Sequence, residues 1–468
     1  MSCVIVRSLI LCILVIFYFH LSPQATAADG EFKNSDERRS GCSSSMGAGG
    51  SLPGNAEATE GDYFALSLTG GGVRNITQIL MLLHIEHLTG RRIHEIFKVV
   101  AGTSAGGMLA VYIAATTGSD GSAMYTLEQI ARQYTRNIRR AFSPSVRHSA
   151  RNLCGLLGPR HENTVLVETF RGVFGKSRLS QTNVELFVPV VNDGSKRLTC
   201  LSTGAARENP KGEDFLLGEL AAGIVAFTGF YAPVEMKNIG GQASRFFDAG
   251  AHAYDPTSLV LEGLQGEGRK ASEIKVLRLG SGVPWLNPVS DKGLRNKNGF
   301  KSLQQTLLML VHGLNVQSET GAKLFFGDQV AERYFHLEFP VPGDVFAAID
   351  ATDSRSIDRL IEAVTNYMRT SEYRRKIEGF FGDKLKANAF DDLEAFLATL
   401  PDIVLSEEDR RPTFCEQSAR FLQACGSGLY TCGSVIYRGF TACGRKTRIG
   451  YQRLAQGPAE GLVGEKED

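Results

Sequence analysis

Two consecutive units of strand, glycine-containing turn and helix constrain the fold of this chain more than any other sequence feature. In the first unit, the apolar run at 63–68 (YFALSL) predicts a buried strand, and the glycines at 70–72 end it in a turn. Apolar residues then recur at near-helical spacing over 76–88, with Gly90 as the expected cap. A strand that leads through a short turn into a helix is a building block of α/β folds.

The second unit repeats this order further along the chain. Residues 96–100 (IFKVV) predict a strand, 102–106 (GTSAG) a tight turn and 108–115 a helix. Further strands are predicted, with helical stretches between them, at 186–191, 245–247 and 274–279. The alternation predicts an α/β fold with a mainly parallel central sheet and helices on both faces. Beyond about residue 300 the pattern turns helical, as over 356–368 and 373–381.

Composition is that of an ordinary globular protein. The chain has 468 residues, of which 43% are hydrophobic and 22% charged, enough for one large core or two domains. Its 51 basic and 50 acidic residues leave a formal charge of +1. No overall field therefore marks nucleic acid or an anionic surface as the partner, although a local patch remains open.

The N-terminus has the features of a secretory signal peptide at 1–27. Arg7 precedes an apolar run at 8–19, and Ala25-Thr26-Ala27 supplies the small residues of a cleavage site. The run is about twelve residues, shorter than the ~18 to 20 that cross a bilayer, so an uncleaved anchor is the weaker alternative. Residues 28–61 contain few large apolar side chains and are predicted to form a flexible linker. We therefore expect a secreted or secretory-pathway protein.

Export would place the cysteines in an oxidising compartment. Cleavage after Ala27 leaves seven of them, at positions 42, 154, 200, 415, 425, 432 and 443. The last four lie close together at spacings that do not match a zinc site, so we predict two disulfides in a small C-terminal tail, with the connectivity open. The odd number leaves at least one thiol unpaired within the chain.

Gly102-x-Ser104-x-Gly106 fits a nucleophile elbow. In such an elbow a sharp turn between strand and helix holds the serine hydroxyl clear of the backbone, and the glycines avoid clashes around it. The N-terminus of the following helix points its free amides at the site and helps to stabilise an oxyanion. The five-residue pattern alone is common in a glycine-rich chain, but its place between a predicted strand and helix favours the elbow over a structural turn.

The glycine loop at 70–72 lies one helix upstream and ends a strand that should run beside the elbow strand. Glycines let backbone amides face a ligand, as an oxyanion hole or a phosphate cradle requires. The loop lacks the lysine and hydroxyl residue of a P-loop and the G-x-G-x-x-G spacing, which excludes a nucleotide loop of either kind. Arg74 next to it could be a solvated charge, an anchor of the loop or a phosphate contact.

The order of these motifs resembles the patatin-like phospholipase family. The resemblance covers roughly 62–370 and is carried by segments listed here: TGGGVRN at 69–75, FKVVAGTSAGGMLA at 97–110, FGKSRLSQTNVELFVPVVND at 174–193, Phe247-Asp248-Ala249-Gly250 with Asp255-Pro256-Thr257, VLRLGSG at 276–282 and ERYFHLEF at 332–339. Several ordered motifs are far more specific than any one of them. The predicted organisation is then a hydrolase domain at 62–370, a helical extension at 371–410 and the cysteine-rich tail at 411–468.

The resemblance implies a metal-free dyad without histidine, in which Ser104 is the nucleophile and Asp248 its base. The oxyanion hole would be formed by the glycine loop, namely Gly70, Gly71, Gly72 and Val73. It also implies a phospholipid or another lipid ester at a membrane or micelle surface as substrate, and no cofactor. A carboxylate is a weak base at its usual pKa of about 3.9, so burial or a tight hydrogen bond to the serine is required.

Three positions depart from the family pattern. The usual Asp-Gly-Gly is Asp248-Ala249-Gly250, the usual Asn-Pro is Asp255-Pro256, and the stretch at 221–233 lacks the Ser-Ala-Ala-Pro of close relatives. That stretch lies near the acyl pocket in the family, so the substrate follows less directly than the nucleophile. The added carboxylate of Asp255 would change the pKa of Asp248 if the two were close.

Two alternatives remain open at this point. An α/β-hydrolase esterase would complete a Ser-His-Asp triad with His252, His312 or His336, although the chain has room for only two strands before Ser104. A storage or lipid-binding protein on the same scaffold would have no activity. No metal-binding motif occurs in the sequence. Asn75-Ile76-Thr77 is a glycosylation sequon that we expect to be unmodified, because it adjoins the glycine loop.

Overall fold

The structure is a computed structural model that describes residues 62–117, 121–142, 158–284, 299–341 and 352–405. The chain divides into two units, 1–408 and 409–468, and all described residues belong to the first. The predicted signal peptide, linker and cysteine-rich tail lie outside the described residues. Of the seven cysteines expected after cleavage, Cys200 lies within them, on strand β6.

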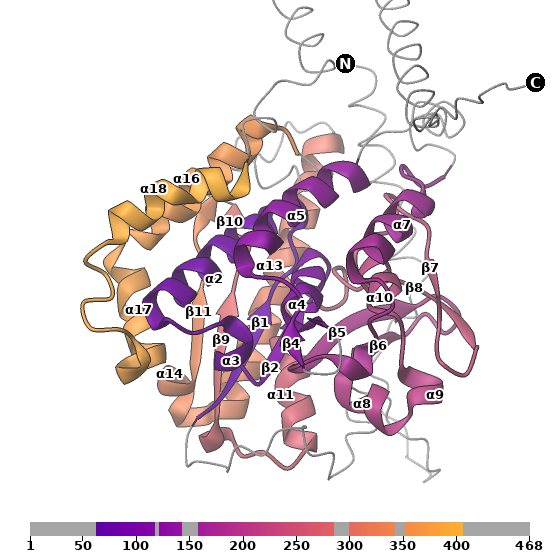
Figure 1. The fold of residues 1–468 in the computed structure, drawn as a ribbon, viewed down its shortest axis with the longest axis horizontal. Coiled ribbons are helices and arrows are strands. Elements are labelled where there is room, and N and C mark those ends of the chain that lie inside the picture. Colours follow the sequence, from indigo (N-terminus) through magenta and orange to yellow (C-terminus); the bar gives the residue numbers. More distant parts are fainter. Residues whose placement is uncertain (1–61, 118–120, 143–157, 285–298, 342–351, 406–468) are drawn as a thin grey trace, which may run out of the picture. The chain divides into compact units, whose positions relative to one another are not determined.

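An eight-stranded sheet forms the centre of the first unit, in the order β11-β9-β1-β2-β5-β8-β7, with β6 paired to β5 (Figure 1). Its strands are β1 (Tyr63–Leu68), β2 (Val99–Gly102), β5 (Glu185–Asn192), β6 (Leu198–Ser202), β7 (Val234–Lys237), β8 (Ala243–Asp248), β9 (Ile274–Leu279) and β11 (Tyr334–Leu337). Two small pairs lie apart from it, formed by β3 (Thr116–Thr117) with β4 (Ser122–Ala123) and by β10 (Val283–Pro284) with β12 (Pro340–Val341).

The sheet is mixed, with a parallel half and an antiparallel edge. Strands β11, β9, β1, β2 and β5 pair in parallel, as expected for strands joined by helical crossovers. Strands β6, β8 and β7 pair antiparallel with their neighbours. The prediction of a mainly parallel sheet is therefore correct for the first half and incomplete at the other edge, where short hairpins join β5 to β6 and β7 to β8.

Helices cover both faces of this sheet, as predicted. On β1, Phe64, Leu66 and Leu68 face the larger core, whereas Ala65 faces a smaller one, as the two-residue period of a strand requires. The helices that line the larger core are α2 (Ile76–Thr89), α4 (Ala105–Ala114), α5 (Leu127–Ala141), α7 (Asn163–Phe174), α10 (Leu217–Ile224), α16 (Ser354–Met368), α17 (Ser371–Phe381) and α18 (Leu393–Val404). The smaller core is lined by α11 (Thr257–Gly266) and α13 (Gly299–Phe326).

Four short α-helices are α3 (Ile93–Ile96), α8 (Thr203–Glu208), α9 (Pro210–Glu213) and α14 (Val330–Arg333). The described elements also include the 3₁₀ helices η1 (Gly72–Asn75), η3 (Leu179–Gln181), η4 (Ala271–Glu273), η5 (Gly327–Gln329) and η6 (Gly382–Lys384). Helix α3 corrects a prediction, because the strand expected at 96–100 begins only at Val99. The Glu95 carboxylate accepts a hydrogen bond from the Arg92 amide and caps a helical turn, and Phe97 N closes it on Ile93 O. The second strand–turn–helix motif therefore enters the elbow from β2, which ends at Gly102.

The predicted helices at 356–368 and 373–381 correspond to α16 and α17. Together with α18 they pack beside α2 and α5 in the larger core (Figure 1). The Tyr373 hydroxyl lies 2.9 Å from His84 Nδ1 and links α17 to α2. The described part of the predicted helical extension therefore shares the core of the sheet. None of the helices in the described ranges is long and apolar enough to cross a membrane.

Candidate active site

Ser104 lies between β2 and α4 in a strained turn. Its backbone angles, φ 55° and ψ −129°, are rare for any residue other than glycine, as is usual for a serine held on a nucleophile elbow. The flanking glycines are required by space. A Cβ on Gly102 would lie 2.2 Å from the Gly106 carbonyl oxygen, and one on Gly106 would lie 2.5 Å from Thr69 O. The elbow can therefore form only with glycine at both positions.

Asp248 ends β8 and lies directly against this serine. The Ser104 hydroxyl donates a hydrogen bond of 2.5 Å to Asp248 Oδ2, across 144 residues of sequence. Gly250 N donates to the other carboxylate oxygen at 2.7 Å. Burial raises the pKa of Asp248 from 3.8 to about 7, against the lowering effect of these two hydrogen bonds. A carboxylate with this pKa can take a proton near neutral pH.

The glycine loop approaches the same serine from β1. A Cβ built on Gly70 would lie 3.4 Å from the Ser104 Cβ, so the loop adjoins the hydroxyl. The Gly70 amide donates to Tyr254 O at 3.0 Å and is committed to that contact. The amides of Gly71, Gly72 and Val73 have no hydrogen-bond partner within the described ranges. Of the four amides predicted to line the oxyanion hole, three therefore have no hydrogen-bond partner among the described residues that would compete with an oxyanion.

Arg74 anchors the loop, one of the three roles that the sequence left open. Its side chain is buried and burial lowers the guanidinium pKa. Nε donates to Gly71 O at 3.3 Å and Nη2 to the Tyr254 hydroxyl at 3.0 Å. That hydroxyl also contacts Ser281 Oγ, which donates to Gly70 O at 2.6 Å. Tyr254 and Ser281 were not predicted as site residues, because only the folded chain brings them to the loop.

Tyr134 on α5 is a further residue that the sequence did not single out. Its hydroxyl donates to Gly72 O at 2.8 Å, which ties the loop to a helix outside the recognised motifs. The sequon asparagine next to the loop, Asn75, is fully buried and donates to Thr69 O at 2.8 Å. The burial supports the expectation that it is unmodified.

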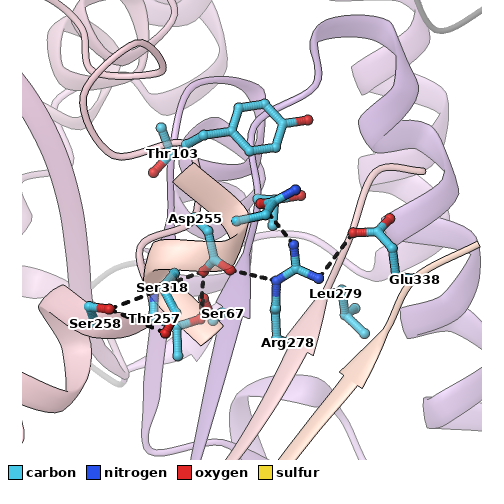
Figure 2. Close-up of polar contacts among 12 residues, drawn as sticks. Ser67, Thr103, Asp255, Thr257, Ser258, Arg278, Leu279, Ser318 and Glu338 are labelled. Carbon is cyan, nitrogen blue, oxygen red and sulfur yellow. Dashed lines mark hydrogen bonds and ion pairs between the residues drawn. The ribbon is translucent and has the colours of Figure 1, made fainter. Parts of the chain in front are cut away.

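Contacts in the structure show where two of the three departures from the motif pattern lie. Asp255 is paired with Arg278 and hydrogen-bonded to Thr257 (Figure 2), and the raised pKa of Asp248 comes from burial rather than from the charge of Asp255. The stretch at 221–233 contacts the base through its backbone, since Ala226 O accepts a hydrogen bond from Asp248 N at 3.2 Å.

The histidines of the alternative triad do not intervene in the dyad. Because the Ser104 hydroxyl donates straight to Asp248, no imidazole lies between the two groups. His312 is exposed on α13, and burial lowers the pKa of His252 and of His336. Within the described part of the chain, no group of three or more His, Cys, Asp or Glu side chains is placed to hold a metal ion.

Comparison with known proteins finds the family that the chain was predicted to resemble. Residues 66–261 match the family model described as patatin-like phospholipase. Patatin-like protein 4 of Arabidopsis thaliana is 27% identical over 214 residues, covering 44% of this chain and 52% of that protein. Probable inactive patatin-like protein 9 of the same plant is 26% identical over 265 residues, covering 53% of this chain and 68% of that protein.

A bacterial protein is similar over a longer part of the chain. The cGAMP-activated phospholipase of Pseudomonas aeruginosa is 24% identical over 309 residues, covering 66% of this chain and 86% of that protein. The crystal structure of VipD from Legionella pneumophila covers 66% of this chain and 68% of its own at 11% identity, with a TM-score of 0.26, too low to support a statement about the fold. The chain spans about half the length of the first plant relatives it matches. Over residues 66–261 the chain is therefore similar to the patatin-like phospholipase family, and it is a distant homologue of the plant patatin-like proteins.

Proposed function

We propose that this chain is a lipid acyl hydrolase of the phospholipase A type, with Ser104 as nucleophile and Asp248 as general base. The observation that carries the proposal is the 2.5 Å hydrogen bond from the Ser104 hydroxyl to a buried carboxylate, on a strained elbow beside free loop amides. The family name supports lipid esters as the substrate class. Fatty-acyl esters of phospholipids or galactolipids, presented at a membrane or micelle surface, are the proposed substrates.

In the first half of the reaction, Ser104 Oγ forms a bond to the ester carbonyl carbon and its proton passes to Asp248 Oδ2. The carbonyl π electrons move to oxygen, and the amides of Gly71, Gly72 and Val73 donate to the resulting oxyanion. The tetrahedral intermediate collapses as the bond to the alcohol breaks. The leaving alcohol takes the proton from Asp248, and the acyl group stays on Ser104.

In the second half, a water molecule attacks the acyl-enzyme. Asp248 accepts one proton from that water while the oxygen bonds to the acyl carbon, and the second oxyanion binds the same amides. Collapse releases the fatty acid and returns the proton to Ser104. The cycle uses only groups of this chain and water, so it requires no metal ion or cofactor.

Export to the secretory pathway is part of the proposal and is supported by the signal-peptide pattern at 1–27. The alternative to an enzyme is a storage or lipid-binding protein, and one relative is named a probable inactive patatin-like protein. The retained serine, carboxylate and loop favour activity, because a binding protein has no need of a strained serine bonded to a buried acid.

The experiment that tests the proposal measures fatty acid released from phosphatidylcholine vesicles and from a short-chain nitrophenyl ester, in EDTA. Wild type is compared with Ser104→Ala and Asp248→Asn. Hydrolysis that both substitutions abolish supports the metal-free dyad, and the preferred substrate separates a phospholipase from a general esterase. A folded but inert wild type would favour the storage or lipid-binding protein. An active Asp248→Asn variant would indicate that a histidine, rather than Asp248, is the general base.

A further inference from the structure

A buried charge network lies beside the candidate active site, centred on Arg278 near the end of β9. Its guanidinium donates to Asp255 Oδ2 at 2.6 Å, to Glu338 Oε2 at 3.0 Å and to Asn315 Oδ1 at 3.0 Å (Figure 2). The side chains of Arg278 and Asp255 are 6% and 0% exposed. Burial alone would lower the pKa of Arg278, but the charges of Asp255 and Glu338 raise it well above its usual value, so the network stays charged.

The segment that contains Asp255 connects this network to the elbow and the glycine loop. Ala253 O accepts a hydrogen bond of 2.6 Å from the hydroxyl of Thr103, the residue before the nucleophile. Tyr254 O accepts the amide of Gly70 at 3.0 Å. The segment 253–255 therefore contacts the elbow and the loop on one side and Arg278 on the other, and it follows Asp248 along the chain.

Both partners of the ion pair lie in segments that carry the family resemblance. Asp255 stands where the usual motif has the Asn of Asn-Pro, and Arg278 lies in the segment VLRLGSG at 276–282. A buried carboxylate or guanidinium alone is costly, whereas the two together compensate each other. The two residues come from separate segments of the chain and form one buried contact in the fold, which indicates that they act as a unit.

We propose that the Asp255–Arg278 pair is a positioning device that fixes segment 253–255 and, through it, the alignment of Ser104, Asp248 and the oxyanion amides. Neither side chain touches the reacting atoms, so both are positioning residues. The inference rests on the proposed function. Its consequence is that an uncompensated charge at either position disturbs turnover, whereas removal of both charges together restores it.

The test compares Asp255→Asn, Arg278→Met and the double substitution in the full chain. Each single substitution is expected to lower kcat by about 100-fold with KM nearly unchanged, since misplacement by about 1 Å costs that much. The double variant is expected to return to within about tenfold of wild type. Lys323→Met, which breaks an exposed pair with Glu319 on α13, is the matched control and should leave kcat unchanged.

Hydrogen exchange of the Gly70 amide supplies a readout that does not need activity. Both single substitutions should speed its exchange, because it is bound to Tyr254 O, while amides of α7, which packs against α5 and α10, keep their protection. If the single variants do not fold, Arg278→Lys replaces them, because a compact ammonium does not reproduce the planar fork that places Nε, Nη1 and Nη2 of Arg278 on three separate acceptors. It should lower kcat with KM unchanged.

Single variants with wild-type kcat and unchanged Gly70 exchange would overturn the positioning role. A double variant as impaired as the sum of the singles would also overturn it, because the residues would then act independently. Wild-type kcat in Arg278→Lys would do the same. A wild type without hydrolysis would instead refute the proposed function, and the exchange comparison would still decide whether the pair fixes the loop.

Discussion

Asp248→Asn is expected to abolish hydrolysis and to stabilise the protein at alkaline pH. The reason is the raised pKa of Asp248, which burial lifts from 3.8 to about 7. In the unfolded chain this carboxyl loses its proton near pH 4, whereas in the folded protein it keeps the proton until about pH 7. Between these values the folded state binds more protons than the unfolded state, so Asp248 makes stability fall as pH rises through this window.

The size of the effect follows from the same two values. A shift of about three pKa units at about 1.36 kcal/mol per unit gives about 4 kcal/mol, fully developed above pH 7 and absent below about pH 4. Asparagine removes this penalty because it carries no charge at any pH. It retains an oxygen that accepts from the Gly250 amide, and its NH₂ group donates to Ser104 Oγ, so both contacts survive with the direction of the hydrogen bond to the serine reversed.

The assay is urea unfolding followed by far-UV circular dichroism at pH 5 and pH 8. The stability of Asp248→Asn relative to wild type should rise by a few kcal/mol between the two pH values. Ser104→Ala is the matched inactive control, and it should show no such gain, because it keeps the buried carboxyl and loses a hydrogen bond that lowers its pKa. A pH-independent difference between Asp248→Asn and wild type would refute the reasoning.

Three further predictions concern the same site. The kcat/KM of ester hydrolysis should fall tenfold per pH unit below about pH 7 and level off above it, because Asp248 acts unprotonated, and an acid limb near pH 4 would contradict the assigned base. Gly102→Ala should yield no folded protein, because its Cβ would lie 2.2 Å from Gly106 O. Gly172→Ala is the matched control on α7: a Cβ there would have no atom within 4 Å, so the variant should gain about 0.5–1 kcal/mol of stability. Comparable thermal melts of the two variants, followed by circular dichroism, would contradict this account. Mass spectrometry of the exported protein should find Asn75 without a glycan, since its side chain is buried, and a glycan there would show that the loop is placed wrongly.

The parts of the fold that follow from local patterns could be predicted from the sequence. The strand at 63–68, the glycine turn and the helix that follows are each indicated by a pattern of neighbouring residues, and β1 and α2 lie where expected. The elbow is local for the same reason. Asp248 is bonded to Ser104 across 144 residues, so only the resemblance to a family could nominate it.

The antiparallel edge of the sheet depends on two turns that the sequence reading did not recognise. Asn192 Oδ1 accepts hydrogen bonds from the amides of Gly194 and Ser195, which closes the hairpin between β5 and β6. Asn238 Oδ1 accepts one from Gln242 N in the hairpin between β7 and β8. Such short connections force antiparallel pairing, whereas apolar runs alone suggest only that a strand exists.

The supporting contacts of the site could not be predicted, because they join residues that are far apart in sequence. The residues next to Arg74 in the sequence do not show whether its side chain is solvated or buried. Only its contact with the Tyr254 hydroxyl shows that it anchors the glycine loop. The added charge at Asp255 was expected to affect Asp248 if the two were close. Its partner is Arg278, which the sequence alone does not connect with it.

The most direct test of the dyad is covalent trapping of the nucleophile. Wild type is incubated with a fluorophosphonate in EDTA, and the modified peptide is identified by mass spectrometry. We predict one adduct on Ser104, formed much more slowly in Asp248→Asn and not at all in Ser104→Ala, with Lys323→Met reacting at the wild-type rate. An adduct on another residue, or an Asp248→Asn variant that reacts as fast as wild type, would contradict the assignment of nucleophile and base.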